Sequence, residues 1–140
     1  MTPHVINGLI YLASPYSDRD EAIRQRRFTQ ACQAAADLMR RGYLVFCPIA
    51  HSHPIARYIP QEGLWEPALD HELWRLQDAP HLDVCGSMIV LCLPGWHRSG
   101  GVMGEIKAMR AAGKPVEFMR LVAGRMRAHP RARRITEAMT

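Results

Sequence analysis

The residue types best suited to chemistry lie in one stretch, where Ser99-Gly100-Gly101 is followed by Glu105. An apolar run from Met88 to Leu93 predicts a buried strand, and the Ser-Gly-Gly turn predicts the start of a helix that Gly113 ends. Backbone N–H groups at a helix start are free to bind an anion or a hydroxyl group, and small residues let a ligand approach them. The stretch therefore predicts a pocket for a sugar or a phosphate.

Glu105 stands out because the helical period places it among apolar side chains. At 100° per residue it lies about 60° from Val102, on the face that also carries Ile106, Met109 and Ala112. The helix dipole favours an anion near the helix start, and a partly sheltered carboxylate can act as a nucleophile or a base. The alternative is a slightly rolled helix, on which Glu105 pairs with Lys107 or Arg110 in solvent.

The first part of the chain predicts a βαβ unit. Val5–Ala13 is apolar and predicts a strand, Arg19–Arg40 has apolar residues at helical spacing, and Tyr43–Cys47 predicts a second strand. A strand, a helix and a strand in this order imply a parallel pair with a right-handed crossover.

The remaining segments extend this unit into an α/β domain. Ile49–Gly63 predicts a loop, Trp65–Gln77 a helix that Asp78-Ala79-Pro80 breaks, and Lys114–Met119 a short fourth strand near an edge, since proline cannot donate to a ladder. We expect a single-domain parallel sheet, flavodoxin/Rossmann-like, with helices on both faces. Ligands of such sheets bind beyond the carboxyl ends of the strands, where three loops should converge: residues 11–17, 48–53 and 94–101.

Composition indicates an ordinary globular chain with a basic end. Of 140 residues 48% are hydrophobic and the net charge is +5, but six arginines and no acid lie between Arg120 and Arg134. We therefore expect a domain over residues 1–119 and a basic tail over 120–140, either solvated or bound to an anionic partner. Binding of nucleic acid by the whole domain is not expected, and neither a membrane span nor a signal peptide is evident, so we expect a cytoplasmic protein.

No metal or cofactor is expected from the cysteines and histidines. Cys32, Cys47, Cys85 and Cys92 lie in predicted core segments without a Cys-x-x-Cys pair, so reduced buried thiols are expected. His51 and His53 have the spacing of metal ligands but no third ligand nearby, which favours substrate contact or hydrogen bonding within the loop.

Several motifs resemble those of the nucleoside 2-deoxyribosyltransferase superfamily. They are Ile10-Tyr-Leu-Ala-Ser-Pro-Tyr-Ser17 after the first strand, Ser99-Gly-x-x-x-x-Glu105, and Gly113-Lys-Pro-Val116. Within this superfamily Phe46-x-Pro-Ile-Ala-His-Ser-His-Pro-Ile55 and Leu93-Pro-Gly-Trp96 resemble the DUF1937 branch of bacteria and phages. The resemblance covers about residues 8 to 118.

The resemblance implies cleavage of the N-glycosidic bond of a (deoxy)nucleoside 5′-monophosphate or nucleoside, by hydrolysis or by base exchange. Glu105 would attack C1′ of the sugar, and Tyr11 would hydrogen-bond this glutamate. Ser99 occupies the position that contacts the sugar or its 5′-phosphate, and a serine there favours a 5′-monophosphate.

A further aspartate of the superfamily handles the leaving base, and its spacing matches Asp78. Because Gly86 occupies the position of a second acid, Asp70 and Asp83 remain candidates for this role. Asp78 is also consistent with a residue that only ends or caps a helix. Paired carboxyl groups roughly 5 Å apart suit retaining glycosyl transfer, and Trp65 or Trp96 would stack on the base.

The resemblance and the loops together predict the substrate contacts. These are Ser14, Tyr16, His51, His53, Trp96, Ser99, Gly100 and Gly101. Relatives are dimers or larger, so we expect a homo-oligomer, a dimer or a tetramer. The alternative function is a non-catalytic module that binds or senses a nucleotide or sugar phosphate.

Overall fold

A computed structural model describes residues 8–132 and 134–135 of the chain. Its sheet has the strand order β2-β1-β3-β4-β5. The strands are β1 (Leu9–Ala13), β2 (Leu44–Phe46), β3 (Ser87–Leu91), β4 (Val116–Val122) and β5 (Arg125–Ala128). The first four pair in parallel, while β4 and β5 form an antiparallel hairpin.

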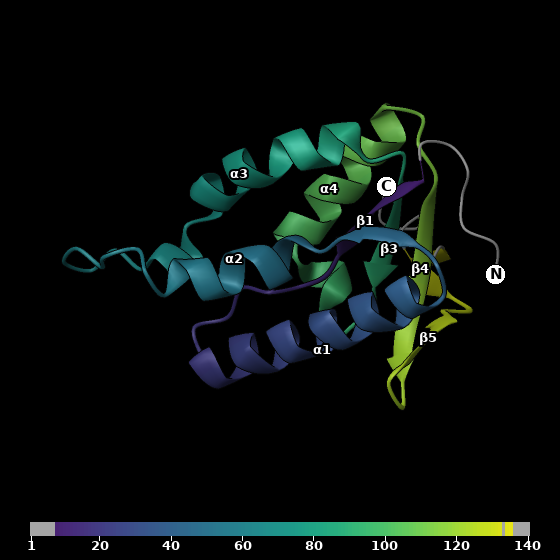
Figure 1. The fold of residues 1–140 in the computed structure, drawn as a ribbon. Coiled ribbons are helices and arrows are strands. Elements are labelled where there is room, and N and C mark those ends of the chain that lie inside the picture. The colour runs from purple at the N-terminus through teal and green to yellow at the C-terminus, as the bar shows by residue number, and fades with distance from the viewer. Residues whose placement is uncertain (1–7, 133, 136–140) are drawn as a thin grey trace.

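Helices cover both faces of this sheet (Figure 1). They are α1 (Glu21–Arg40), α2 (Pro48–Ala56), α3 (His71–Val84) and α4 (Gly100–Ala111), with 3₁₀ turns η1 (Pro67–Leu69) and η2 (Trp96–Arg98). The expected α/β fold with helices on both faces is confirmed, with a sheet that is mostly parallel.

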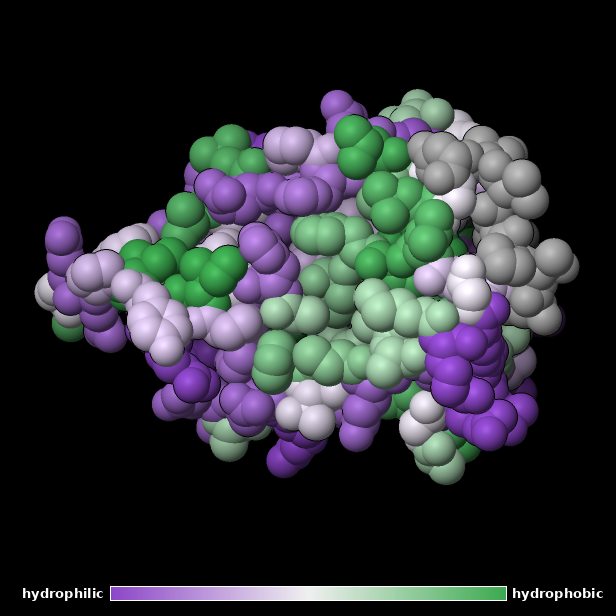
Figure 2. Space-filling view, viewed as in Figure 1, coloured by the Kyte–Doolittle hydropathy of each residue, from purple (hydrophilic) through white to green (hydrophobic). Residues whose placement is uncertain are grey.

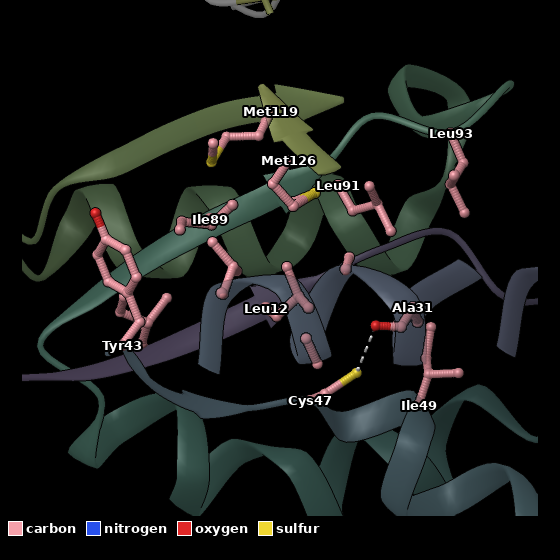
Figure 3. Packing of buried hydrophobic residues seen from close by; sticks show 14 residues of the cluster. Leu12, Ala31, Tyr43, Cys47, Ile49, Ile89, Leu91, Leu93, Met119 and Met126 are labelled. Atoms are coloured by element: carbon pink, nitrogen blue, oxygen red, sulfur yellow. Dashed lines mark hydrogen bonds between the residues drawn. The ribbon is translucent and has the colours of Figure 1, made fainter. Parts of the chain in front are cut away.

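Alternation along the strands divides the core into two clusters. Ile10 and Leu12 of β1 face α1, where they pack with Ala31, Leu38, Ile89 and Leu91 (Figure 3). Tyr11 and Ala13 face the opposite way and pack with Met88, Val90, Val102, Ile106 and Met109, on the side of α4. Because successive strand residues point to opposite faces, Tyr11 is directed toward the helix that carries Glu105.

Two helices contain prolines and differ from the sequence-based expectation. Residues 49–63 are predicted to be a loop, but α2 occupies Pro48–Ala56, with Pro48 in its first turn and Pro54 inside it. The predicted helix 65–77 is displaced, because α3 begins after Asp70 and continues through Pro80 to Val84. A proline removes one helical hydrogen bond, and here packing of Ile49 and Leu82 against the two clusters holds the helices despite that loss.

The two carboxyl-terminal strands also differ from the expectation based on the sequence. β4 is predicted to be a short strand, at or near an edge, that ends at Met119. It lies next to the edge strand β5, as expected, but it is longer and continues to Val122. Residues 120–128, predicted to begin a basic tail, form the end of β4 and all of β5. Exposed arginines alternate with buried Met126 in β5, and a strand that buries one face needs few apolar residues.

The surface view shows hydrophobic residues over the middle of one face, between α1 and α3 (Figure 2). The segment between α2 and α3 projects away from the body of the molecule (Figure 1). Among the described residues, no helix combines the length and apolar character needed to cross a membrane.

Asp37 ties the end of α1 to β5. Its buried carboxylate pairs with Arg40 and Arg41 at 2.7 and 2.8 Å and accepts the backbone N–H of Met126 at 2.9 Å. Burial by itself raises the pKa of Asp37, but the Met126 N–H and the two guanidinium groups outweigh it and hold the pKa below its ordinary value.

We expect Asp37→Ala to lower the free energy of unfolding by about 2–4 kcal/mol, because it leaves a buried N–H without its acceptor and removes the partner of two arginines. Urea denaturation near pH 7 measures this change. The difference from the unsubstituted chain should shrink as the pH falls below about 4, because protonation then removes the same charge.

Glu72→Ala is the matched control. Glu72 pairs with Arg75 at the same i,i+3 spacing as Asp37 with Arg40, but both members of this pair are exposed. Its loss should leave the unfolding midpoint unchanged. Equal effects of the two substitutions would contradict a structural role for Asp37.

Candidate active site

A cavity of about 700 Å³ lies beyond the carboxyl ends of β1 and β2, between α2, α3 and α4. The loop after β1 contributes Ser14, Tyr16 and Ser17 to its wall, α2 contributes Pro48, Ile49, Ser52 and Ala56, and α4 contributes residues from Gly100 to Ala108. This is the edge of a parallel sheet where α/β proteins bind ligands. The cavity is large enough for a ligand of nucleotide size.

Tyr11 and Glu105 meet in this cavity. The Tyr11 hydroxyl donates a hydrogen bond to Oε2 of Glu105, and both residues line the wall. Tyr11 is fully buried on β1, and Val102, Ile106 and Met109 fix α4 against the same face of the sheet. The structure thus places Glu105 inward and not in solvent beside Lys107 or Arg110.

Burial controls the charge of this pair. Desolvation raises the pKa of Glu105 to about 7, the bond from Tyr11 opposes this rise, and the nearby Asp78 adds to it. Desolvation and the negative charge of Glu105 also raise the pKa of Tyr11, which therefore remains a hydrogen-bond donor at neutral pH. A carboxyl group poised near pH 7 is typical of catalytic sites.

A second carboxyl group enters the cavity from α3. Asp78 lines the wall, and burial raises its pKa to about 6, against the opposing effect of His81 and His51. The His81 ring stacks on Phe46, with ring centroids 4.1 Å apart, and the His51 ring lies 6.5 Å from that of His81. The two histidines are thereby held beside the aspartate.

The start of α4 supplies polar groups to the same cavity. Ser99 caps this helix, where its Oγ accepts the N–H of Val102 at 3.3 Å, and Gly100 and Gly101 lie beside it in the wall. Ser14 is 7% exposed, and its Oγ has no hydrogen-bond partner among the described residues although it lines the cavity. A buried hydroxyl without a partner is available to a ligand.

A network on α1 positions the loop after β1. The buried guanidinium of Arg24 donates to the carbonyl of Asp18 at 2.6 Å and pairs with Glu66 at 2.9 Å. The Tyr16 hydroxyl lies 2.6 Å from Nδ1 of His53, whose Nε2 lies 3.0 Å from Gln25 Oε1. Tyr16 and Ser17 are therefore held at the wall by groups that lie outside the cavity.

Comparison with known proteins assigns the chain to a family. Residues 8–121 match the family described as "Domain of unknown function (DUF1937)". The chain belongs to this family. A comparison with curated proteins finds no match.

A solved structure shares the fold. A 2-deoxyribosyltransferase from the psychrotolerant bacterium Bacillus psychrosaccharolyticus superposes with a TM-score of 0.55 at 20% sequence identity, over 80% of this chain and 72% of the other. The expected DUF1937 branch and the nucleoside 2-deoxyribosyltransferase-like fold are thereby confirmed.

The structure of this DUF1937 domain separates the predicted site residues into two groups. Those that line the cavity are Tyr11, Ser14, Tyr16, Asp78, Ser99, Gly100, Gly101 and Glu105. His51, His53 and Trp96 do not: His51 lies beside Phe46, and His53 lies behind Tyr16. Trp96 is 5% exposed and packs on Phe118 in the core, because a residue of η2 faces the sheet.

The competing aspartates have different surroundings. Asp70 caps α3 through the N–H of Leu73 and accepts a hydrogen bond from the exposed Trp65, which is a structural role. Asp83 lines the cavity but is exposed, whereas Asp78 is partly buried.

Sequence reasoning missed Trp74, Gly104 and Leu82 in the wall of the cavity. Trp74 and Leu82 lie four residues before and after Asp78 on α3, a spacing that marks one face of a helix. Among the described residues, no group of three histidines, cysteines or acids could hold a metal ion.

We expect Tyr11→Phe to raise the pKa of Glu105 further above about 7, because the hydroxyl stabilises the ionised carboxylate. An NMR titration of ¹³C-labelled glutamate carboxyl groups measures this pKa directly, without any assumption about substrate.

Tyr43→Phe serves as the control, since it removes a buried hydroxyl from the cluster on the opposite face of the sheet. It should leave the pKa of Glu105 unchanged. A pKa that stays constant or falls in Tyr11→Phe would show that the hydroxyl does not stabilise the anion.

Proposed function

We propose that this domain cleaves the N-glycosidic bond of a (deoxy)nucleoside or its 5′-monophosphate, with Glu105 as the nucleophile. The observation that carries the proposal is the Tyr11–Glu105 hydrogen bond in a cavity that also holds a second, partly buried carboxyl group, Asp78. The shared fold with a 2-deoxyribosyltransferase supports it.

In the first step an ionised oxygen of Glu105 bonds to C1′ of the sugar. The bond from C1′ to the base nitrogen breaks, and its electron pair leaves with the base. The hydroxyl of Tyr11 keeps donating to Glu105 and so favours the anion that attacks. The product is a glycosyl ester of Glu105.

Asp78 supplies the proton that the departing base needs. Its raised pKa of about 6 lets the carboxyl group hold a proton closer to neutral pH than an exposed aspartate does. As a carboxylate it then accepts a proton from water or from a second base as that molecule attacks C1′. Glu105 is released, and the configuration at C1′ is retained overall.

The other end of the substrate fits the start of α4. Ser99, the N–H groups beside Gly100 and Gly101, and the unpartnered hydroxyl of Ser14 offer donors to a sugar hydroxyl or a 5′-phosphate. The preference for a 5′-monophosphate, the choice between water and a second base, and the homo-oligomer remain predictions from the sequence.

We expect Glu105→Gln to lower the rate of base release by at least about a thousandfold, because the amide retains the shape but not the nucleophile. The measurement is chromatography of free base after incubation with a panel of nucleosides and 5′-monophosphates. Glu62→Gln is the control, since Glu62 is exposed and lies outside the cavity wall.

Turnover by Glu105→Gln at the unsubstituted rate would refute the proposal. Tight binding of a nucleotide by the unsubstituted chain without any release of base would instead favour the binding or sensor function.

The pH dependence should follow the two carboxyl groups. Release needs one proton on the pair, held by Asp78 while Glu105 is ionised. Because the pKa of Glu105 is the higher of the two, this arrangement is the minor form of the singly protonated pair, and kcat/KM should pass through a maximum between about pH 6 and 7. Asp78→Asn should lower the rate by about 10²–10⁴-fold for a natural base. It should have far less effect on a 4-nitrophenyl deoxyriboside, whose leaving group needs no proton.

An equal loss for both leaving groups would contradict the role of Asp78 as the acid.

A further inference from the structure

Three aromatic side chains of the phenylalanine, tyrosine and tryptophan types line the cavity among the described residues: Tyr11, Tyr16 and Trp74. Tyr11 is hydrogen-bonded to Glu105. The Tyr16 hydroxyl is hydrogen-bonded to His53, and the rings of Tyr16 and His53 also meet edge to face. Both tyrosines thus have established partners within the protein. Trp74 is the third, and the proposed chemistry above does not use it.

The place of Trp74 follows from that of Asp78. The two residues lie four apart on α3, so their side chains emerge one turn from each other on the same face. A group that gives a proton to the departing base must lie within hydrogen-bond reach of it. In the proposed reaction the base therefore lies at Asp78, and the side chain of Trp74, one turn away, lies beside it.

The indole of Trp74 can present its ring to the base, but not its N–H. Nε1 donates to the carbonyl of Pro67 at 2.8 Å, which also fixes the side chain against η1. Trp74 is only half-buried, so part of the ring remains open to the cavity. A fixed aromatic surface without a free donor suits stacking on a planar ring.

We propose that Trp74 is the surface on which the base of the substrate stacks, a role that rests on the proposed function. Every base has a π-face, so a contact of this kind accepts purines and pyrimidines alike. The site therefore takes N-glycosides of aromatic bases as a class, and polar groups elsewhere in the wall select among them. Trp65 is exposed and Trp96 is buried in the core, and neither lines the cavity.

The test compares Trp74→Phe with Trp74→Leu. Both substitutions remove the hydrogen bond to Pro67, but only phenylalanine keeps an aromatic ring. Binding is measured in the Glu105→Gln background, where turnover does not interfere, by calorimetric titration with 2′-deoxyadenosine, thymidine and base-free 2-deoxyribose. Tyr58→Leu is the control, because it removes an exposed aromatic ring outside the cavity.

Trp74→Leu should weaken the binding of both nucleosides by about tenfold to a hundredfold and leave that of 2-deoxyribose unchanged. The affinity of Trp74→Phe for both nucleosides should stay within about threefold of that of the Glu105→Gln parent. The affinity of the control, Tyr58→Leu, should equal that of the parent. In the active chain, Trp74→Leu should raise KM much more than it lowers kcat.

Two results overturn the assignment. Unchanged binding in Trp74→Leu excludes stacking, and an equal loss in Trp74→Phe and Trp74→Leu shows that the bond to Pro67 matters and the ring does not. If neither nucleoside binds the parent chain, the proposed function itself fails. That outcome is distinct from nucleoside binding that does not depend on Trp74.

Discussion

A carboxyl group that is largely withdrawn from water needs a donor, and the hydrogen bond from Tyr11 to Glu105 meets that need where the sheet and α4 are in contact. The strand alternation that buries Ile10 and Leu12 on one face necessarily directs Tyr11 to the other. Glu105 lies on the inner face of its helix because the apolar residues around it dock there. The chemistry of the site thus depends on the same packing that forms the core.

The outer wall of the cavity is built differently. None of the residues of α3 is fully buried, so this helix lies over the cavity and is not part of the core. Its position depends on Leu82, on the cap formed by Asp70, and on the bond between Trp74 and Pro67. The loop after β1 is held likewise from outside, by Arg24. A rigid inner wall and a separately anchored outer wall enclose a space for a ligand.

The parts of the fold that sequence patterns predict are those that one strong period determines. The helical period around Glu105 predicts the inner face of its helix, where the structure places it, whereas the contact of Tyr11 with Glu105 is expected only from the resemblance to the superfamily. The helices that contain Pro54 and Pro80 were not predicted correctly, because tertiary packing overrides the local effect of proline. Trp96 was expected at the substrate, yet only the three-dimensional packing of η2 shows that its ring enters the core.

The two outer strands of the sheet bear on how copies of this chain can meet. β2 has three residues, and β5 has four, among them the exposed Arg125 and Arg127. The edge strand β2 is too short to pair extensively with another strand, and the like charges on β5 repel a second copy of that strand. Assembly by continuing the sheet from one copy into the next is therefore disfavoured, and contacts between copies would form through the helices and loops.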